Sequence, residues 1–164
     1  MINTTLLPHF LSSDFIHTTL HFFSFSGLAF LEKNKAAEGV VTLSSGLQYK
    51  VLRKGDGDSH PKISTPCECH YEGRTTRNWP SGPVFDSSYE RGQTATFAPN
   101  QVIKGWTEAM QLMVEGDKWE LYIPSELAYG DNGRPPRIQG GDCLIFTIEM
   151  VKIKGSSVPR KEEL

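Results

Sequence analysis

Residues 101–113 read QVIKGWTEAMQLM, and the apolar side chains of this stretch recur at the spacing of an α-helix. They follow one another at i, i+3, i+4 and i+7, which places them in one stripe along a helix. The members of this stripe are Trp106, Ala109, Met110 and Met113. The pattern predicts a helix near 104–113 that packs its apolar stripe on a sheet, and it is the one convincing core helix in the sequence.

The segments around this helix alternate in polarity, as strands with one buried face do. In the run CECHYEG, Cys67, Cys69 and Tyr71 point to one face, so we expect Tyr71 to be buried beside the cysteines. The run CLIFTIEMVKI at 143–153 alternates in the same way. Shorter strand candidates lie at 47–53, 84–86 and 95–97. With 15 Gly and 10 Pro available for turns, the sequence predicts an α+β fold in which an antiparallel sheet wraps around one short helix.

The run KWELYIP at 118–124 is a further strand with two different faces. One face would carry Trp119, Leu121 and Ile123, and the other Lys118, Glu120 and Tyr122. The next segment, LAYGDNGRPPRIQGGD at 127–142, consists of turn-forming residues. A loop of this length inside a compact domain is usually functional.

Charge and cysteine content exclude some classes of protein. The net charge of -2, from 17 basic and 19 acidic residues, provides no basic field for nucleic acid. The three cysteines are an odd number, so they cannot form a complete disulfide framework. We interpret Cys67 and Cys69 as small buried hydrophobic residues, with a disulfide from one of them to Cys143 as the alternative.

The two ends of the sequence bear on localisation. Residues 1–31 contain no Lys or Arg, and their apolar run at 20–31 is too short to span a bilayer. A short helix is expected at 27–38. The final residues Lys161–Leu164 approximate an ER retention signal, a weak secretory hint, and without it the expected location is the cytoplasm. We divide the chain into an N-terminal extension at 1–42, a main domain at 43–154 and a polar tail at 155–164.

Signatures of common enzyme chemistry are absent from the sequence. It has no G-x-S-x-G, Walker, G-x-G-x-x-G or H-E-x-x-H motif. Asp56, Asp58 and His60 alternate in a way that could hold a metal, but their glycine neighbours favour a solvated turn. We therefore predict neither a metal nor a cofactor.

Aromatic residues from separate segments form the remaining feature. They are Tyr71, Phe85, Phe97, Trp106, Tyr129 and Phe146. Such residues often form only a core. However, the charged Asp86 directly follows Phe85 and would lie among them, which a purely apolar core does not explain.

Several short motifs, in order, carry a family resemblance. They are VFDSS (84–88), QVIKGWTEAMQLM (101–113), Gly116-Asp117, IPSELAYG (123–130) and LIF (144–146). Over about residues 43–154 the chain resembles the FKBP-type peptidyl-prolyl cis-trans isomerases. It is most similar to their macrophage infectivity potentiator branch, through FLEKNKAAEGVVTLSSGLQYKVL (30–52). The resemblance implies a curved antiparallel sheet of five to six strands around one helix, with an apolar pocket between them.

The resemblance also implies a role for each matched residue. The catalytic side chains would be Asp86, Tyr129 and Tyr71, with Asp86 beside the reacting amide and the Tyr129 hydroxyl on a bound carbonyl. The substrate-binding residues would be Phe85, Gln101, Val102, Ile103, Trp106, Ile138 and Phe146, with Trp106 as the floor. The sequence departs from the family pattern at Ala95, a wall position that is often aromatic, and at the flap residues Arg134, Pro136 and Arg137.

A dry aromatic pocket of this kind predicts prolyl isomerisation, because it penalises the dipolar planar amide more than the twisted one. The expected partners are proline-containing polypeptides, whose folding the enzyme would assist, and macrolides of the tacrolimus and rapamycin type. One alternative is a non-catalytic proline-peptide-binding or chaperone module on the same fold. Another is a structural sheet domain with a solid aromatic core and no pocket.

Overall fold

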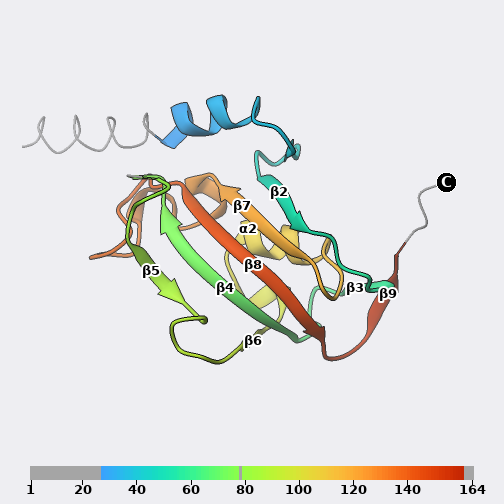
Figure 1. Cartoon of the computed structure of the whole chain (residues 1–164). Coiled ribbons are helices and arrows are strands. Elements are labelled where there is room, and N and C mark those ends of the chain that lie inside the picture. The colour runs from blue at the N-terminus through green and yellow to red at the C-terminus, as the bar shows by residue number, and fades with distance from the viewer. Residues whose placement is uncertain (1–26, 78, 161–164) are drawn as a thin grey trace, which may run out of the picture.

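The computed structural model describes residues 27–77 and 79–160, and its main feature is a curved antiparallel sheet (Figure 1). Seven strands form this sheet, in the order β1-β2-β7-β8-β4-β5, and β6 pairs with β4 beside β5. The strands are β1 (Val40–Thr42), β2 (Gln48–Arg53), β4 (Cys67–Thr75), β5 (Val84–Ser87), β6 (Ala95–Phe97), β7 (Lys118–Ile123) and β8 (Leu144–Ile153). The predicted fold class is confirmed, with more strands than the five to six expected.

The two longest strands, β4 and β8, pair along their whole lengths and form the middle of the sheet. A register shift between Glu68 and Cys69 interrupts this pairing near one end, as a β-bulge does. Alternate residues of β4 are buried, and Cys67, Cys69 and Tyr71 are all at most 6% exposed, as their spacing predicted. The inward side of β4 therefore supplies both core residues and one wall of the site described below.

Helix α2 (Lys104–Met110) packs its predicted stripe on one face of the sheet. It is shorter than the predicted 104–113, because Leu112 N–H bonds the Ala109 carbonyl and so tightens the last turn. Met113 is nevertheless fully buried. Gly105 lets the helix approach β7 closely, since a Cβ at this position would lie 2.6 Å from Cγ2 of Ile123. Three short 3-10 helices flank the site: η1 (Pro99–Gln101), η2 (Ser125–Leu127) and η3 (Gly130–Asn132).

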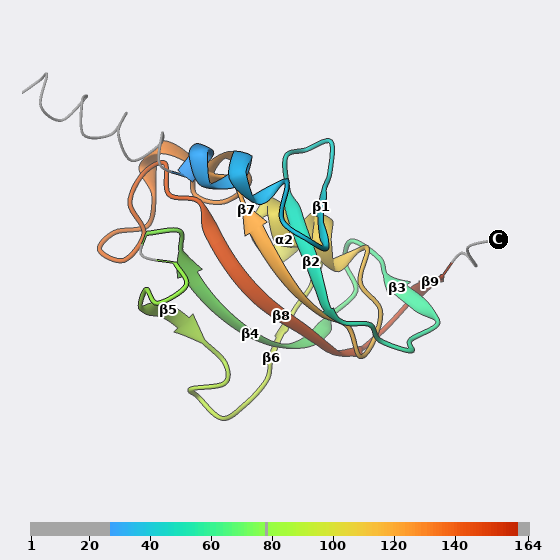
Figure 2. The same ribbon diagram turned by 45° about the horizontal axis from the view of Figure 1, so that its top comes forward.

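A second helical segment, residues 27–34, lies across the opposite face of the sheet (Figure 2). Its Leu31 joins a small buried cluster with Tyr122, Cys143 and Ile145. Tyr122 lies on the face of β7 that points away from α2, and the N-terminal segment covers it to 5% exposure. Its exposure could not be read from β7 alone, because the covering residues come from a distant part of the sequence.

Both ends of the described chain add strands to the fold. β1 precedes residue 43, the predicted start of the main domain. Within the predicted polar tail, β9 (Ser157–Pro159) pairs with β3 (Ser59–Pro61) to form a separate two-stranded sheet. The last predicted feature of the tail, Lys161–Leu164, lies outside the described residues, as does most of the apolar run at 20–31.

All three cysteines are buried and free, which confirms the interpretation of Cys67 and Cys69 as core residues. Cys143 belongs to the cluster on the other face of the sheet. The alternative of a disulfide between these positions is therefore wrong. Burial raises the pKa of the Cys69 thiol to about 12, so the thiol is uncharged at neutral pH.

Replacement of Leu31 by Ala tests the contribution of the N-terminal segment. Leu31 is 5% exposed, so Leu31→Ala should lower the free energy of unfolding by about 2 kcal/mol through lost burial and the cavity it leaves. Leu28 lies in the same helical segment but is 48% exposed, so Leu28→Ala should change it by less than about 0.5 kcal/mol. Urea denaturation measures both. Equal effects of the two variants would show that Leu31 does not hold the segment on the sheet.

Candidate active site

A cavity of about 480 Å³ opens between α2, the inner face of the sheet and the loop after β7. The residues that line it come from six separate parts of the chain: Tyr71, Asp86, Phe97, Gln101, Val102, Ile103, Trp106, Ala128, Tyr129, Arg134 and Phe146. Its volume lies within the usual range for small-molecule sites. An open cavity among these aromatic rings contradicts the alternative of a solid aromatic core.

The floor of the cavity is Trp106, which α2 presents to the sheet. Tyr71, Phe97 and Phe146 meet the Trp106 ring edge to face, with ring centroids 5.3, 5.9 and 5.1 Å away. Edge-to-face contacts suit the quadrupoles of aromatic rings and fix their orientation. The buried indole nitrogen of Trp106 has no hydrogen-bond partner among the described residues.

Asp86 is held at the edge of the cavity by two donors. The Tyr71 hydroxyl donates to Asp86 Oδ2 at 2.8 Å, and Arg91 Nη1 binds Asp86 Oδ1 at 2.5 Å. Arg91 Nη2 also donates to the Tyr71 hydroxyl at 2.7 Å, which closes a triangle of three side chains. The carboxylate is therefore fixed in position before any ligand arrives.

This triangle determines the charge of the site. Burial alone would raise the pKa of Asp86, but the hydrogen bonds from Arg91 and Tyr71 outweigh burial and hold that pKa below its ordinary value of 3.8. Burial and the neighbouring carboxylate raise the pKa of Tyr71. At neutral pH the cavity thus contains an ionised Asp86 and a protonated Tyr71 phenol.

Tyr129 also lines the cavity and belongs to the segment that separates β7 from β8. Its hydroxyl accepts a hydrogen bond from Arg134 Nη1 at 3.3 Å. The Arg134 guanidinium also lies over the Tyr129 ring, 5.8 Å from the centroid. The hydroxyl can still donate its own proton, so it remains available to a carbonyl oxygen of a ligand.

The structure brings the residues proposed from the sequence into one region. All of them line the 480 Å³ cavity except Phe85 and Ile138, which line an adjoining cavity of about 310 Å³. Gln101 caps the turn before α2, because its Oε1 accepts the Ala98 N–H at 2.9 Å. The side chain of Gln101 is thereby occupied, which suits its proposed role through the main chain.

The sequence pointed to Phe97 as one of the aromatic residues but gave it no place in the site, and it missed Arg91 and Gly73 altogether. Phe97 lines the cavity and Ala95 does not, although both lie on the same face of β6. Arg91 completes the triangle, and only the fold shows that it reaches back to Asp86. Gly73 lies beneath the rings of Phe85 and Phe146, where a Cβ would come within 2.7 and 2.5 Å of them. A glycine inside a strand was the available signal for such a close approach.

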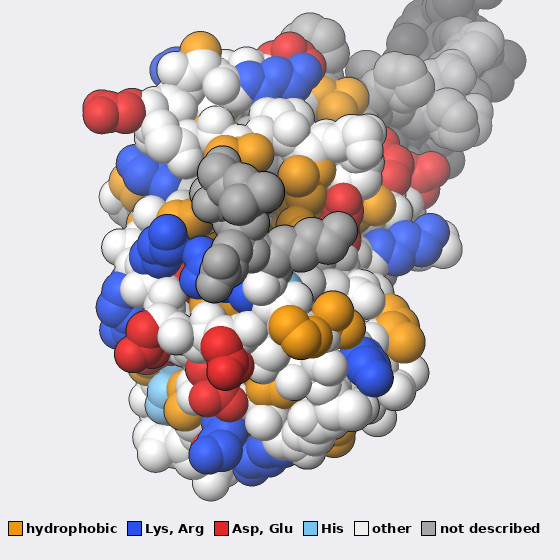
Figure 3. Space-filling model, turned by 90° about the vertical axis from the view of Figure 1, so that its right-hand side faces the viewer, with side chains coloured by type: hydrophobic (Ala, Val, Ile, Leu, Met, Phe, Trp, Pro, Cys, Tyr) orange, Lys and Arg blue, Asp and Glu red, His pale blue; other side chains and the backbone are white. Residues whose placement is uncertain are grey.

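A larger cavity of about 920 Å³ lies at the far end of the molecule, beside β3 and β9. Figure 3 views this end, where hydrophobic side chains show between charged ones. The rings of Tyr49 and Trp119 stack on each other in its wall, with their centroids 4.4 Å apart. Asp58 and His60 also line it, but within residues 27–77 and 79–160 no group of three or more His, Cys, Asp or Glu side chains is placed to hold a metal.

Comparison with known proteins identifies the family to which this fold belongs. The family model described as FKBP-type peptidyl-prolyl cis-trans isomerase matches residues 57–151, more than half of the chain. The chain belongs to this family. A second model, described as the domain amino terminal to the FKBP-type isomerase, matches residues 25–51, which include the helical segment and most of β2. The predicted family resemblance is thus confirmed.

Individual FKBP-type proteins agree with this assignment. The chain is 46% identical to the macrophage infectivity potentiator of Trypanosoma cruzi, over 84% of this chain and 68% of that protein. It is 48% identical to the peptidyl-prolyl cis-trans isomerase Mip of Coxiella burnetii, over 77% and 53%. The crystal structure of FkpA from Escherichia coli superimposes with a TM-score of 0.77 at 35% identity, covering 84% of this chain and 62% of that one. The chain thus spans about half to two thirds of the length of these relatives.

A further relative is named outer membrane protein MIP, from Legionella longbeachae. Among the described residues of this FKBP-type chain, no helix has the length and apolar character needed to cross a bilayer. The secretory hint in Lys161–Leu164 stays a prediction from the sequence.

Replacement of Gly73 by Ala tests whether the close packing of the walls keeps the cavity open. The new methyl group would displace the Phe85 and Phe146 rings, at a cost of about 1 to 3 kcal/mol in stability. The displaced rings should weaken binding of a proline peptide about 10-fold, which fluorescence titration of the folded protein measures. Gly92→Ala is the control. A Cβ at Gly92 would meet no atom within 4 Å, so this variant strains only the backbone, whose φ is positive there. Unchanged affinity in a folded Gly73→Ala protein would mean that these rings do not shape the binding site.

Proposed function

We propose that this chain catalyses cis-trans isomerisation of X-Pro peptide bonds in polypeptides, at the cavity over Trp106. The observation that carries the proposal is the aromatic floor and walls with one ionised carboxylate held at their edge. Membership of the FKBP family supports it. No covalent bond breaks in this reaction, so the side chains of the cavity suffice.

The chemical problem is the barrier to rotation of a peptide bond. This barrier is about 18 to 20 kcal/mol, because the twisted amide loses its resonance. A planar amide is more dipolar than a twisted one, so its transfer from water into an aromatic cavity raises the energy of the ground state more than that of the transition state. The rings around Trp106 provide such a surrounding. The shape of the floor also selects the proline ring.

The polar groups would then hold the twisted amide. The Tyr129 hydroxyl would donate to a substrate carbonyl, and the main chain at Gln101 would bind the peptide backbone. Asp86 lines the same cavity, and Tyr71 and Arg91 hold its carboxylate in place. A prearranged dipole costs no reorganisation during the reaction, so it stabilises a changing charge distribution effectively. Because both oxygens of Asp86 are already bonded, its contribution is electrostatic and does not involve proton transfer.

Macrolides of the tacrolimus and rapamycin type are the second class of ligand that we propose. They would occupy the same cavity and compete with the peptide. Phe97 supports this proposal, since it supplies the aromatic wall that Ala95 lacks. The alternative of a non-catalytic proline-binding module would use the same walls but would leave the rate of isomerisation unchanged.

The activity itself is tested with a short X-Pro peptide. The purified chain should accelerate cis-to-trans conversion without added metal or nucleotide, and a macrolide should inhibit it. Protease-coupled or NMR exchange assays measure the rate, with a heat-denatured sample as control. A folded protein that binds the peptide and leaves its rate unchanged would support the non-catalytic module instead.

Replacement of Asp86 separates the charge from the apolar cavity. Asp86→Leu should lower kcat/KM about 10-fold, equivalent to about 1.4 kcal/mol of barrier, because the aromatic walls remain. Tyr71→Phe is the matched variant, since it removes one bond to Asp86 and keeps the ring on Trp106. It should lose less activity than Asp86→Leu.

Trp106→Ala should lose more activity than either variant, and its folding must be verified first, because loss of this floor costs about 3 to 5 kcal/mol of stability. If Asp86→Leu abolished catalysis and preserved peptide binding, the carboxylate and not the apolar walls would be the main source of catalysis. Wild-type activity in Asp86→Leu would remove Asp86 from the catalytic residues.

A further inference from the structure

The flap that borders the site carries two arginines that form no ion pair with a carboxylate of the described residues. Arg134 and Arg137 are both exposed, and neither has a carboxylate within 4.0 Å among the described residues. Other arginines at this end of the molecule are paired. Arg91 binds Asp86, and Arg77 binds Asp142 at 2.8 Å. The flap therefore presents net positive charge beside the cavity.

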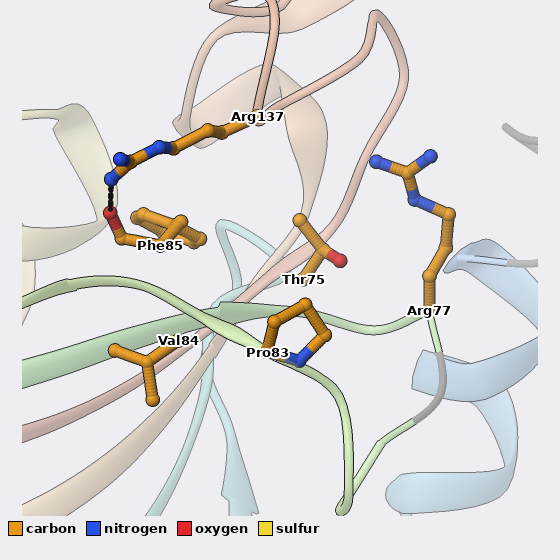
Figure 4. A pocket seen from close by; sticks show the side chains of 6 residues that line it. All are labelled: Thr75, Arg77, Pro83, Val84, Phe85 and Arg137. Carbon is orange, nitrogen blue, oxygen red and sulfur yellow. Dashed lines mark hydrogen bonds between the residues drawn. The ribbon is translucent and has the colours of Figure 1, made fainter.

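Both guanidinium groups are held against walls of the site. Arg137 Nη1 donates to the Phe85 carbonyl at 2.5 Å, as Figure 4 shows, and its side chain extends over the Phe85 ring. Arg134 lies over the Tyr129 ring and bonds its hydroxyl. A guanidinium has five N–H donors, so each arginine keeps donors for another acceptor. These contacts distinguish the pair from arginines that extend freely into water.

The space beside these arginines adjoins the cavity over Trp106. The 310 Å³ cavity is lined by Arg134, Arg137 and Phe85, and it shares Asp86 and Phe146 with the larger one. On its other side Phe85 and Arg137 also line a cavity of about 490 Å³, which Figure 4 shows with Arg77 across from Arg137. An extended peptide advances about 3.3 to 3.6 Å per residue, so a neighbour of a bound proline reaches this space.

We infer that Arg134 and Arg137 make the site selective for substrates with an anionic side chain next to the proline. The inference rests on the proposed function for the position of the proline itself. Guanidinium groups bind carboxylate and phosphate oxygens in charge-assisted, often bidentate, hydrogen bonds. Asp86 also lines this space, but its negative charge is already paired with the positive charge of Arg91, so the two flap arginines leave net positive charge there. The same chemistry serves a glutamate or a phosphoserine.

Matched peptides test the selectivity. One pair places Glu or Gln directly before proline, and a second pair places Glu or Gln directly after it. In one of these pairs the wild-type kcat/KM for the Glu peptide should exceed that for the Gln peptide about 5-fold at low ionic strength. About 0.5 M salt should reduce this ratio, because the charges are exposed and screened. A phosphoserine peptide in the favoured position shows which anion the site prefers.

Variants assign the selectivity to the flap. Arg134→Gln and Arg137→Gln should each lower the Glu-to-Gln ratio, and the double variant should bring it to about 1. Arg160→Gln is the control, because it removes the same charge at the 920 Å³ cavity at the other end of the molecule, and it should leave the ratio unchanged. A wild-type ratio of 1 or below in both pairs would overturn the inference, as would a ratio that survives in the double variant.

The two proposals fail in different ways. If the Gln peptides are isomerised but no Glu preference is found, the inference is wrong and the proposed function stands. If no peptide is isomerised, the proposed function is wrong, and the dissociation constants of the same Glu and Gln peptides, measured by NMR titration with wild type and double variant, still decide the inference. Equal dissociation constants would refute it.

Discussion

The edge-to-face packing of Trp106 against three rings from the sheet is the contact on which both the fold and the site depend. Trp106 is 4% exposed, and its centroid distances to Tyr71, Phe97 and Phe146 all lie below 6 Å. The same ring fixes α2 on the sheet and provides the floor of the cavity. Burial of a large aromatic surface stabilises the domain, while the fixed ring geometry prevents the walls from collapsing into the space above. Stability and function therefore share one side chain.

Glycine at two positions makes this arrangement possible. Gly105 brings α2 close to Ile123 on β7, and Gly73 lets Phe85 and Phe146 lie directly on the backbone of β4. A side chain at either position would push apart the layers that enclose the cavity. Close packing is normally a means of filling a core. Here the absence of a side chain at Gly73 leaves space for two rings, and its absence at Gly105 lets α2 lie close to β7.

Charge in the site is divided between two systems. Asp86, Tyr71 and Arg91 form a closed triangle whose bonds satisfy one another, so the carboxylate contributes a fixed field to the cavity. Arg134 and Arg137 belong to the flap, and within the described residues their side chains bond a phenol and a main-chain carbonyl but no carboxylate, so their positive charge borders the 310 Å³ cavity. The first system would act on the reacting amide, and the second would act on its neighbours in the peptide. The two roles meet at Tyr129, because Arg134 also donates a hydrogen bond to its hydroxyl.

The sequence by itself determined the fold class, the core helix and most of the lining of the cavity. Periodicity is a local property, so the apolar stripe through Trp106 and the alternation of β4 could be predicted without knowledge of any tertiary contact. The residues carried by family motifs, such as Asp86 and Tyr129, were equally accessible. Only the tertiary structure decided that Tyr122 is covered, that Arg91 closes on Asp86 and that Gly73 underlies two rings. Each of these depends on which distant segment lies opposite, and a one-dimensional pattern records the face of a side chain but not what covers that face.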